Sequence, residues 1–484
     1  MHSKLDMSRF GQGAAAWPDY DLRAVGVGIV HLGVSAFHRA HQAVYVDALL
    51  GQDPRWGICG ASLKTARVRD ALRAQDGLYT LAIQEEAAPL RVIGALRQVL
   101  AGDEDRAALA ERLAAPATRV VSLTVTEAGY CLGRDGALDF DHPDIRADLA
   151  GTPRSAIGWI VEGMARRRAA GAAPFTTLSC DNLSRNGALL KAAVVALAGR
   201  RDPELARWIE GEARFPNTMV DSITPKTDEA LIARVETELG AHDGAPVQRE
   251  PFTQWVIEDE ARPGMPDWGA VGVTLTGDVA PFARAKLRLL NGSHSALAYL
   301  GLLAGFTTVA EAMGAPWLER YITALMRDSA DTLATARGLD ISAYAEAVRT
   351  RFRNPAVRHA LAQIAMDGSQ KMPIRTLTTM SERLAAGKPV DAHCWALAAW
   401  LHFIRRQARA GTQIVDPLSD ALAALGRGMT DEAGHDVDAA LRLTGVFPAD
   451  IAAARESIIA AYAALRDGQA RNDIGAAVAA RWPA

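Results

Sequence analysis

The sequence has few cysteines, no long apolar run and no excess of charge of either sign. Its four cysteines, Cys59, Cys131, Cys180 and Cys394, are widely scattered. Such spacing does not suit a disulfide framework and indicates a reducing compartment. No apolar run reaches the roughly 18 residues that a membrane-spanning helix needs, and the N-terminus lacks the apolar core of a signal peptide. We therefore expect a cytoplasmic protein that makes no use of a membrane.

The small net charge excludes another class of partner. A formal charge of −3 over 484 residues provides no field that would gather nucleic acid or anionic lipid. Hydrophobic residues make up 49% and charged residues 23% of the chain, which is ordinary for a globular protein. This length allows two or three domains. The composition thus predicts a globular protein that binds no nucleic acid.

Short apolar runs alternate with helical patterns over the first half of the chain, after an irregular lead-in at 1–25. This alternation predicts βαβ units and a mostly parallel sheet. We expect strands at 26–34, 56–62, 78–84, 90–96, 119–127, 176–180 and 272–277, and helices at 35–50, 64–75 and 187–199.

The amino-acid composition of the chain changes after the last of these strands. From there onward the chain is rich in Ala, Leu and Arg, with apolar residues at helical spacing. We therefore predict an α/β Rossmann-type N-terminal domain at 1–276 and an all-α C-terminal domain at 277–484.

The first strand leads into a degraded dinucleotide-binding fingerprint. Gly33 can permit the tight turn between strand and helix, whereas Ser35 and His38 replace the second and third glycines. The N-terminus of the following helix would then face a pyrophosphate. An ordinary structural turn explains the same glycine equally well.

The acid that usually binds the ribose is missing after the second strand. At this point the chain offers Lys64, Thr65 and Arg67, and no acid before Asp70. Either the ribose is held differently or the cations accept a 2′-phosphate. Solvated helix residues are the plainer interpretation of Lys64 and Arg67.

The segment KLRLLNGSH, at 286–294, carries the most chemical information. Asp278 and Pro281 fit a helix start before it. On an α-helix, Lys286, Asn291 and His294 would fall within an arc of about 140°. A ketone-forming reaction needs a base for the alcohol proton and donors for the developing oxyanion. The alternative is a surface lysine, a capping asparagine and a core histidine.

Polar residues also follow two of the predicted strands. Asn182, in SCDNLSRNG, would lie at the carboxyl edge of the sheet, where open α/β folds bind ligands; an Asx-turn at Asp181-Asn182 is the structural alternative. Glu127, in TVTEAGY, leaves a strand at the same edge and would relay a proton or cap the next segment. His38 and His41 have no carboxylate or cysteine at ligand spacing, so we expect no metal.

Taken together, these segments resemble the long-chain mannitol dehydrogenase family of polyol dehydrogenases and hexuronate reductases. The matching pieces run in the expected order from about residue 29 to 375, and the helical tail extends the match. They are IVHLGVSAFHRAHQAVY, SLTVTEAGY, SCDNLSRNG, FPNTMVDSITP, QWVIED, KLRLLNGSHSALAYLG and DGSQKMPIR.

The resemblance implies a fold, a chemistry and a set of site residues. It implies a Rossmann-type domain followed by a helical domain, and metal-independent hydride transfer with NAD. Lys286 matches the catalytic lysine, and Asn182, Asn291 and His294 match the residues that polarise the reacting oxygen. The remaining matches are Glu127 for proton movement, Asp221 and Lys371 for the substrate, and Gly33, Ser35, Phe37 and Lys64 for the cofactor.

Three positions depart from the family pattern. The missing ribose acid puts the cofactor preference in question and leaves NADP open. Ser222 stands where other members carry an arginine, and Gln363 stands where mannitol dehydrogenases place a substrate-binding arginine. The stretch at 354–375 looks more like the fructuronate reductase branch.

We therefore expect reduction of a keto-hexuronate such as fructuronate to the aldonate. The carboxylate of such a substrate binds best to a cluster of cations, which Lys371, Arg375 and Arg288 can supply. The alternative is a polyol 2-dehydrogenase that acts on mannitol or arabinitol. A non-catalytic nucleotide-binding sensor on the same fold is the alternative from a different class. A monomer or a small homo-oligomer fits each of these.

Overall fold

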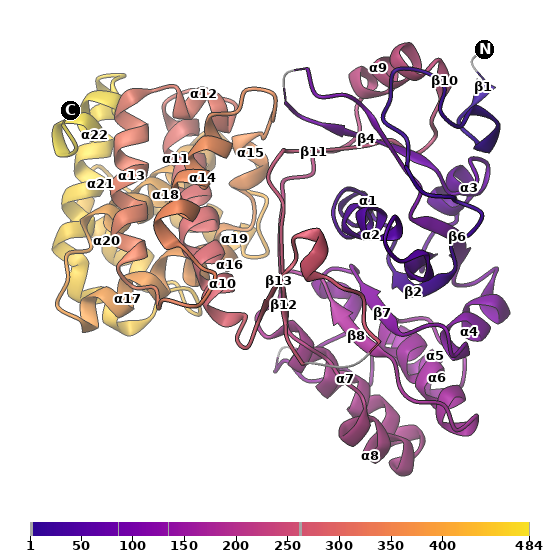
Figure 1. Cartoon of the computed structure of the whole chain (residues 1–484). Coiled ribbons are helices and arrows are strands. Elements are labelled where there is room, and N and C mark those ends of the chain that lie inside the picture. The colour runs from indigo at the N-terminus through magenta and orange to yellow at the C-terminus, as the bar shows by residue number, and fades with distance from the viewer. Residues whose placement is uncertain (1–2, 86, 134, 261–263, 484) are drawn as a thin grey trace. The chain divides into compact units, whose positions relative to one another are not determined.

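The computed structural model describes residues 3–85, 87–133, 135–260 and 264–483. The chain divides into two compact units, Met1–Ala280 and Pro281–Ala484. In Figure 1 the first unit, coloured indigo through magenta, contains both strands and helices. The second unit, coloured orange to yellow, is drawn as helices.

A five-stranded parallel sheet organises the first unit. Its strands, in spatial order, are β6 (Leu96–Ala101), β3 (Gly57–Ser62), β2 (Val27–Leu32), β7 (Val120–Leu123) and β8 (Thr176–Ser179). β2 comes first in the chain and lies in the middle, with β3 on one side and β7 on the other. This order is that of a Rossmann sheet. The predicted α/β Rossmann-type fold of this unit is confirmed.

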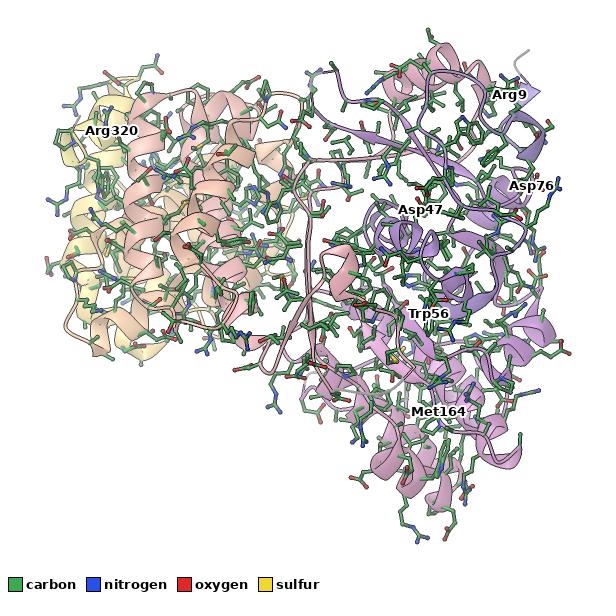
Figure 2. All side chains as sticks on the ribbon, in the orientation of Figure 1. Arg9, Asp47, Trp56, Asp76, Met164 and Arg320 are labelled. Atoms are coloured by element: carbon green, nitrogen blue, oxygen red, sulfur yellow. The ribbon has the colours of Figure 1, made fainter. Side chains whose placement is uncertain are left out.

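Helices cover both faces of this sheet with buried apolar side chains. Met164 of α6, labelled in Figure 2, is buried in the cluster between one face and α4 to α8. Trp56, also labelled, is buried in the cluster on the opposite face, with α1 and α2. The bounds are α1 (Ala36–Ala40), α2 (Gln42–Leu50), α4 (Arg106–Ala114), α5 (Pro143–Leu149), α6 (Ala156–Ala169), α7 (Asn186–Arg201) and α8 (Pro203–Glu212). Burial on both faces explains why the strands are nearly continuous apolar runs.

Three predicted strands lie outside the main sheet, and one of them, at 272–277, forms β13 (Thr274–Thr276) in another sheet. The segments at 78–84 and 90–96 form β4 (Tyr79–Ile83) and β5 (Arg91–Ile93), which pair antiparallel. With β11 (Val247–Arg249) they make a separate sheet in the order β11-β4-β5. The short connection between β4 and β5 allows antiparallel pairing, whereas a parallel pair needs a long crossover. The second segment also ends early, because Leu96 already belongs to β6.

Smaller elements complete the first unit. A third sheet has the order β13-β12-β9, and the lead-in is partly regular because β1 pairs with β10. The bounds are β1 (Ser3–Lys4), η1 (Met7–Arg9), η2 (Pro54–Trp56), α3 (Arg67–Arg73), η3 (Glu127–Tyr130), β9 (Thr218–Asp221), α9 (Glu229–Leu239), β10 (Ala241–His242), β12 (Gln254–Glu258), η4 (Gly269–Val271) and β13 (Thr274–Thr276).

The second unit is helical throughout its named elements, as the sequence predicts. Its long helix α18 packs against α11, α19 and α21. The bounds are α10 (Ala280–Ala285), η5 (Lys286–Asn291), α11 (Gly292–Leu303), α12 (Val309–Met313), α13 (Pro316–Ala330), α14 (Ile341–Arg353), α15 (Leu361–Ile364), α16 (Gly368–Met372), η6 (Pro373–Leu377), α17 (Thr378–Ala385), α18 (Asp391–Arg409), α19 (Ser419–Gly428), α20 (Ala433–Leu441), η7 (Ala449–Ala454), α21 (Arg455–Ala470) and α22 (Ile474–Arg481). No helix in the described part of the chain is long and apolar enough to cross a membrane.

A histidine in the interior of the second unit makes its stability depend on pH. His402 of α18 is buried, and among the described residues neither ring nitrogen has a hydrogen-bond partner. Burial, followed by the charges of Arg405 and Arg406, lowers the pKa of His402 to about 4. The folded pKa lies below the unfolded value of about 6.5. The neutral ring is therefore tolerated fully above that value, and stability falls as the pH drops toward 4.

We expect His402→Phe to flatten the dependence of unfolding free energy on pH between 6 and 4.5. The slope should fall by about 1.4 kcal/mol per pH unit, because one proton no longer binds on unfolding. Denaturant unfolding at several pH values measures this. Ile404→Val, a buried change in the same helix, is the control, since it should cost about 1 kcal/mol at every pH. An unchanged slope in His402→Phe would contradict the prediction.

Candidate active site

The turn after β2 lies where the strand order of the main sheet reverses. From β2 the sheet continues through β3 to β6 on one side, whereas from β7 it continues to β8 on the other side. Ligands bind at such switch points, where the strand order reverses. Gly33 has φ +96°, and a Cβ there would lie 2.3 Å from the backbone oxygen of Thr124, just beyond β7. Any other residue would force these two loops apart. Gly33 therefore holds the two strand ends close together.

The residues that replace the other two glycines have structural partners. Ser35 is the N-cap of α1 and accepts a hydrogen bond from the backbone N–H of His38 at 3.1 Å. The ring of His38 stacks on His31 of β2, with 3.4 Å between centroids. Burial, and then the neighbouring His31, lowers the pKa of His38 well below its usual value. Two neutral imidazoles thus make the contact between helix and strand that a third glycine would normally permit.

The helix predicted at 35–50 is interrupted. The five-residue α1 ends at Ala40, and His41, with φ −123° and ψ −88°, separates it from α2. Phe37 is half-buried on α1, and its ring stacks on His41 at 5.0 Å between centroids. The single continuous helix predicted at 35–50 is therefore wrong, because the segment forms two helices separated at His41.

Lys64 and Arg67 differ in local structure. Lys64 lies in the loop between β3 and α3, at the carboxyl edge of the sheet, and Arg67 begins α3. Both side chains are exposed. The predicted helix at 64–75 therefore starts later than expected, at Arg67, and Lys64 stands outside it. An exposed cation at this edge fits contact with a charged cofactor as well as plain solvation.

Asp181 joins the two segments that carry Glu127 and Asn182. Its carboxylate accepts hydrogen bonds from the backbone N–H of Thr126 at 2.8 Å and of Val125 at 3.2 Å. Burial raises the pKa of Asp181, and the nearby charge of Glu127 raises it further. The Asx-turn interpretation is wrong for Asp181, since these partners belong to the loop after β7. Glu127 and Asn182 are both exposed on these linked loops.

Sequence reasoning missed this anchoring role of Asp181. The Tyr130 hydroxyl, at the end of η3, also donates to its carboxylate at 3.1 Å. The residues that Asp181 binds lie more than fifty positions earlier in the chain. No local motif indicates such pairing; only the adjacency of two parallel strands could have suggested it.

Asp221 ends β9, in the sheet beside the main one. It is buried, and its backbone pairs with Gln254 of β12. The next residue, Ser222, donates a hydrogen bond to the backbone oxygen of Phe252 at 3.0 Å. Ser222 is therefore a backbone-binding residue and brings no charge to this position.

Lys286 and Asn291 lie at the two ends of a π-helical segment. The six residues of η5 connect α10 to α11, and the N–H of Gly292 bonds to the oxygen of Leu287, five residues back. Asp278 accepts from the N–H of Ala280 at 2.8 Å at the start of α10, as a helix start there requires. The α-helical geometry assumed for the predicted arc is wrong at this segment, because η5 is π-helical. Such segments are rare and often occur at functional sites.

A second π-helical segment contacts the first and carries Arg375. η6 continues α16 into α17, and the N–H of Thr378 bonds to the oxygen of Pro373. The helical path therefore continues through Pro373, since the wider π turn accommodates a residue without an N–H. The Arg375 guanidinium donates to the Ser295 hydroxyl at 3.2 Å and to the Asn291 oxygen at 3.5 Å.

His294 lies on α11 among aromatic and cationic neighbours. Its ring is 4.4 Å from that of Phe352 and 5.0 Å from that of His359, between centroids. Burial, followed by His359, Arg351 and Arg375, lowers the pKa of His294 well below its usual value. Its Nε2 is buried and has no hydrogen-bond partner among the described residues. A neutral ring with an unpaired nitrogen suits a group that binds a reacting oxygen.

His359 is a further residue that the sequence did not single out. It packs edge-on against His294, and burial, followed by the charge of Lys371, lowers its pKa. Lys371 lies on α16, 3.7 Å from Asp367, and burial and then Arg375 lower its pKa. Asn291, His294, Lys371 and Arg375 are thus brought together within the second unit, whereas no spacing pattern connects them to His359.

Arg288 does not belong to this cation cluster. It is 4% exposed, and its guanidinium forms an ion pair with Glu382 at 2.5 Å and donates to the Thr332 oxygen at 3.0 Å. The expectation that Arg288 could hold a substrate carboxylate is therefore wrong, because a protein carboxylate already neutralises it.

One group of described residues has the geometry of metal ligands, namely Cys131, His142 and Asp144. None of the candidate catalytic residues belongs to it. His38 and His41 are not part of such a group among the described residues either.

Two family models match most of the chain. The mannitol dehydrogenase Rossmann domain matches residues 27–270, and the mannitol dehydrogenase C-terminal domain matches residues 278–467. The chain belongs to the mannitol dehydrogenase family. The resemblance found in the sequence is confirmed, and the protein is an oxidoreductase of this family.

Relatives from this family cover nearly the whole chain. D-mannonate oxidoreductase of Escherichia coli K12 is 41% identical over 477 residues, which are 95% of this chain and 98% of the relative. A mannitol 2-dehydrogenase of Aspergillus fumigatus is 38% identical over 471 residues, 93% of each chain.

Solved structures of the family have the same fold. Pseudomonas fluorescens mannitol 2-dehydrogenase, in a ternary complex with NAD and D-mannitol, matches with a TM-score of 0.83 at 36% identity and covers 99% of both chains. A substrate-free D-sorbitol dehydrogenase matches with a TM-score of 0.90 at 32% identity, over 98% of this chain and all of that one.

Proposed function

We propose that this protein is an NAD(H)-dependent oxidoreductase that reduces a keto-hexuronate such as fructuronate to the aldonate. The observation that carries the proposal is the environment of Arg375. Its guanidinium is half-buried beside Asn291 and Ser295, and no described carboxylate lies within ion-pair distance of it. A second cation, Lys371, lies close enough to affect it. Two neighbouring cations, of which Arg375 has no ion-pair partner among the described residues, favour an anionic substrate.

The residues of the first unit fit a bound dinucleotide. The Gly33 turn stands at the switch point of a Rossmann sheet, and Ser35, Phe37 and Lys64 follow the carboxyl ends of β2 and β3. In this proposal these residues hold NAD(H), which when bound supplies or accepts the hydride. Glu127 passes a proton to or from solvent, as its exposure permits.

In this proposal, polar groups of the second unit transfer the proton and stabilise the oxyanion. Lys286 gives a proton to the carbonyl oxygen during reduction and takes it back during oxidation. Asn291 and neutral His294 donate hydrogen bonds to the oxygen as negative charge develops, the role for which Asn182 is also a candidate. Asp221 accepts from substrate hydroxyls, and Lys371 and Arg375 bind the carboxylate at the far end.

A panel of fructuronate, tagaturonate, fructose, mannitol and arabinitol, each with NAD(H) and NADP(H), tests the proposal. We expect the largest kcat/KM on a hexuronate. The identity to mannitol 2-dehydrogenases supports the second candidate, a polyol 2-dehydrogenase. A wild type that prefers mannitol or arabinitol would favour it. Nucleotide binding without turnover on any substrate would favour a sensor.

Cofactor preference provides a separate prediction. We expect a higher kcat/KM with NAD(H) than with NADP(H), although no acid follows β3 and Lys64 is exposed there. Lys64→Ala should then change the NAD(H) value by less than about tenfold. The ratio of kcat/KM for the two cofactors measures the preference. A clear NADP(H) preference that collapses in Lys64→Ala would show instead that this cation binds a 2′-phosphate.

Chelation should leave turnover intact. The candidate catalytic residues lie outside the described group with metal-ligand geometry, and Lys286 supplies the acid and base that a metal would otherwise provide. The measurement is kcat after extended dialysis against EDTA, compared with a mock-dialysed sample. Activity that is lost in a sample whose melting temperature is unchanged, and then restored by Zn²⁺, would contradict a metal-independent reaction.

A further inference from the structure

Three side chains of different chemistry converge after β7, outside the candidate catalytic residues. They are the thiol of Cys131, the imidazole of His142 and the carboxylate of Asp144, and one ligand atom from each lies within 4.8 Å of the others. The thiol is buried, whereas the other two side chains are half-buried. Solvent therefore reaches the cluster from one side only.

The backbone fixes the thiol in an uncommon conformation. Cys131 closes η3 with φ 52° and ψ 45°, the left-handed region that non-glycine residues seldom adopt. Its backbone oxygen accepts a hydrogen bond from the N–H of Asp139 at 2.9 Å, which brings the chain back beside it. Strain of this kind occurs mostly at sites where a side chain must be held in place.

The imidazole is oriented by the start of α5. His142 is the N-cap of this helix, and its Nδ1 accepts a hydrogen bond from the N–H of Asp144 at 3.2 Å. A histidine is uncommon as an N-cap, where Ser, Thr, Asp and Asn are preferred. This bond belongs to the metal-free ring, in which Nδ1 carries the lone pair and Nε2 the proton. On metal binding, either Nδ1 exchanges this bond for the metal or the proton moves from Nε2 to Nδ1.

The surroundings of the thiol hold several carboxylates. Burial is the main cause that raises the pKa of Cys131 to about 11, and Asp144 and Asp148 raise it further. Lys64 acts in the opposite direction. Because Lys64 is exposed at the end of a long stem, its charge can move into solvent. The cluster therefore combines soft and hard donors with local negative charge.

We propose that Cys131, His142 and Asp144 bind a divalent cation of the Zn²⁺ class. Thiolate, imidazole and carboxylate are the donors that zinc prefers, and three protein ligands leave a fourth position for water. On binding, the thiol proton passes to solvent and a metal–sulfur bond forms, with no change of oxidation state. The cation fixes η3, the turn that begins with Glu127, to the start of α5.

Because the cation would fix the turn that carries Glu127, the test relies on metal binding and not on activity. The apoprotein, prepared by chelation, is titrated with Zn²⁺ by calorimetry and with Co²⁺ by absorption. We expect one equivalent of either metal, a thiolate-to-cobalt charge-transfer band in the near ultraviolet, and a melting temperature that rises by several degrees. Absence of stoichiometric binding, or binding without the thiolate band, would overturn the proposal.

Two variants and their controls complete the test. His142→Asn keeps a good N-cap but removes the imidazole ligand, and Cys131→Ala removes the sulfur. Each should weaken Zn²⁺ binding by more than about a hundredfold, because losing an outer partner alone costs roughly 10–100-fold. Cys59→Ala, a buried thiol of β3, and His242→Asn, an exposed histidine, are the matched controls. Equal binding by His142→Asn and wild type would overturn the proposal even if Cys131→Ala failed to fold.

Discussion

Replacement of Lys286 by alanine should reduce turnover by several orders of magnitude while cofactor binding persists. Lys286 begins the π-helical segment that also carries Asn291, and His294 follows on α11. Without the amine, no positioned group gives a proton to the carbonyl oxygen, whereas the residues around Gly33 are untouched. Stopped-flow measurement of hydride transfer tests the loss, and fluorescence titration tests cofactor affinity.

Lys388→Ala is the matched control for this variant. Lys388 lies in the same unit and forms an ion pair with Asp331 at 2.7 Å, away from the candidate residues. Its loss should leave hydride transfer within about twofold, because a surface ion pair contributes little. If Lys286→Ala retained a rate within tenfold of wild type, the acid/base assignment would be wrong.

Replacement of Arg375 by alanine should weaken hexuronate use and spare uncharged polyols. The loss in kcat/KM corresponds to roughly 2–4 kcal/mol of transition-state binding, about 30- to 900-fold, since a substrate carboxylate would lose its buried partner. The measurement is kcat/KM on fructuronate and on mannitol, for wild type and variant. Activity on mannitol should change by less than about threefold.

Ser295→Ala tests whether Arg375 acts by binding the substrate carboxylate or by supporting the protein backbone. The Ser295 hydroxyl accepts from the Arg375 guanidinium at 3.2 Å, so its removal loosens the arginine without removing its charge. It should cost about tenfold or less on the hexuronate. Equal losses on both substrates in Arg375→Ala would remove this residue as a carboxylate clamp and leave it a purely structural role.

The strands of the main sheet could be predicted because the pattern that marks each of them lies within a few consecutive residues. Buried parallel strands are short apolar runs, and 26–34, 56–62 and 176–180 contain β2, β3 and β8. The segments at 78–84 and 90–96 are equally apolar, but their place in a second sheet depends on β11, more than 150 residues later. Apolar pattern alone carries no information on such partners.

The candidate site was predictable in its residue types but not in its geometry. The motifs around Lys286 and Asn182 name polar groups, whereas the partner of Arg288 is Glu382, 94 positions away. Nothing in KLRLLNGSH distinguishes a π-helix from an α-helix, and the contact of η5 with η6 joins segments more than eighty positions apart. His359 was missed because it is far from His294 in the sequence and contacts it only in the folded protein.

The two π-helical segments make the register of this unit sensitive to single-residue length changes. Each holds one residue more per turn than an α-helix, so deleting one residue from η5 would let that turn relax to regular geometry. The wider turn that sets the angle between Lys286 and His294 would then be lost, although neither side chain had changed. Chain length at η5 and η6 therefore constrains sequence variation as strongly as residue identity does. Deletion of single residues would detect this constraint on chain length, whereas substitution of single residues would not.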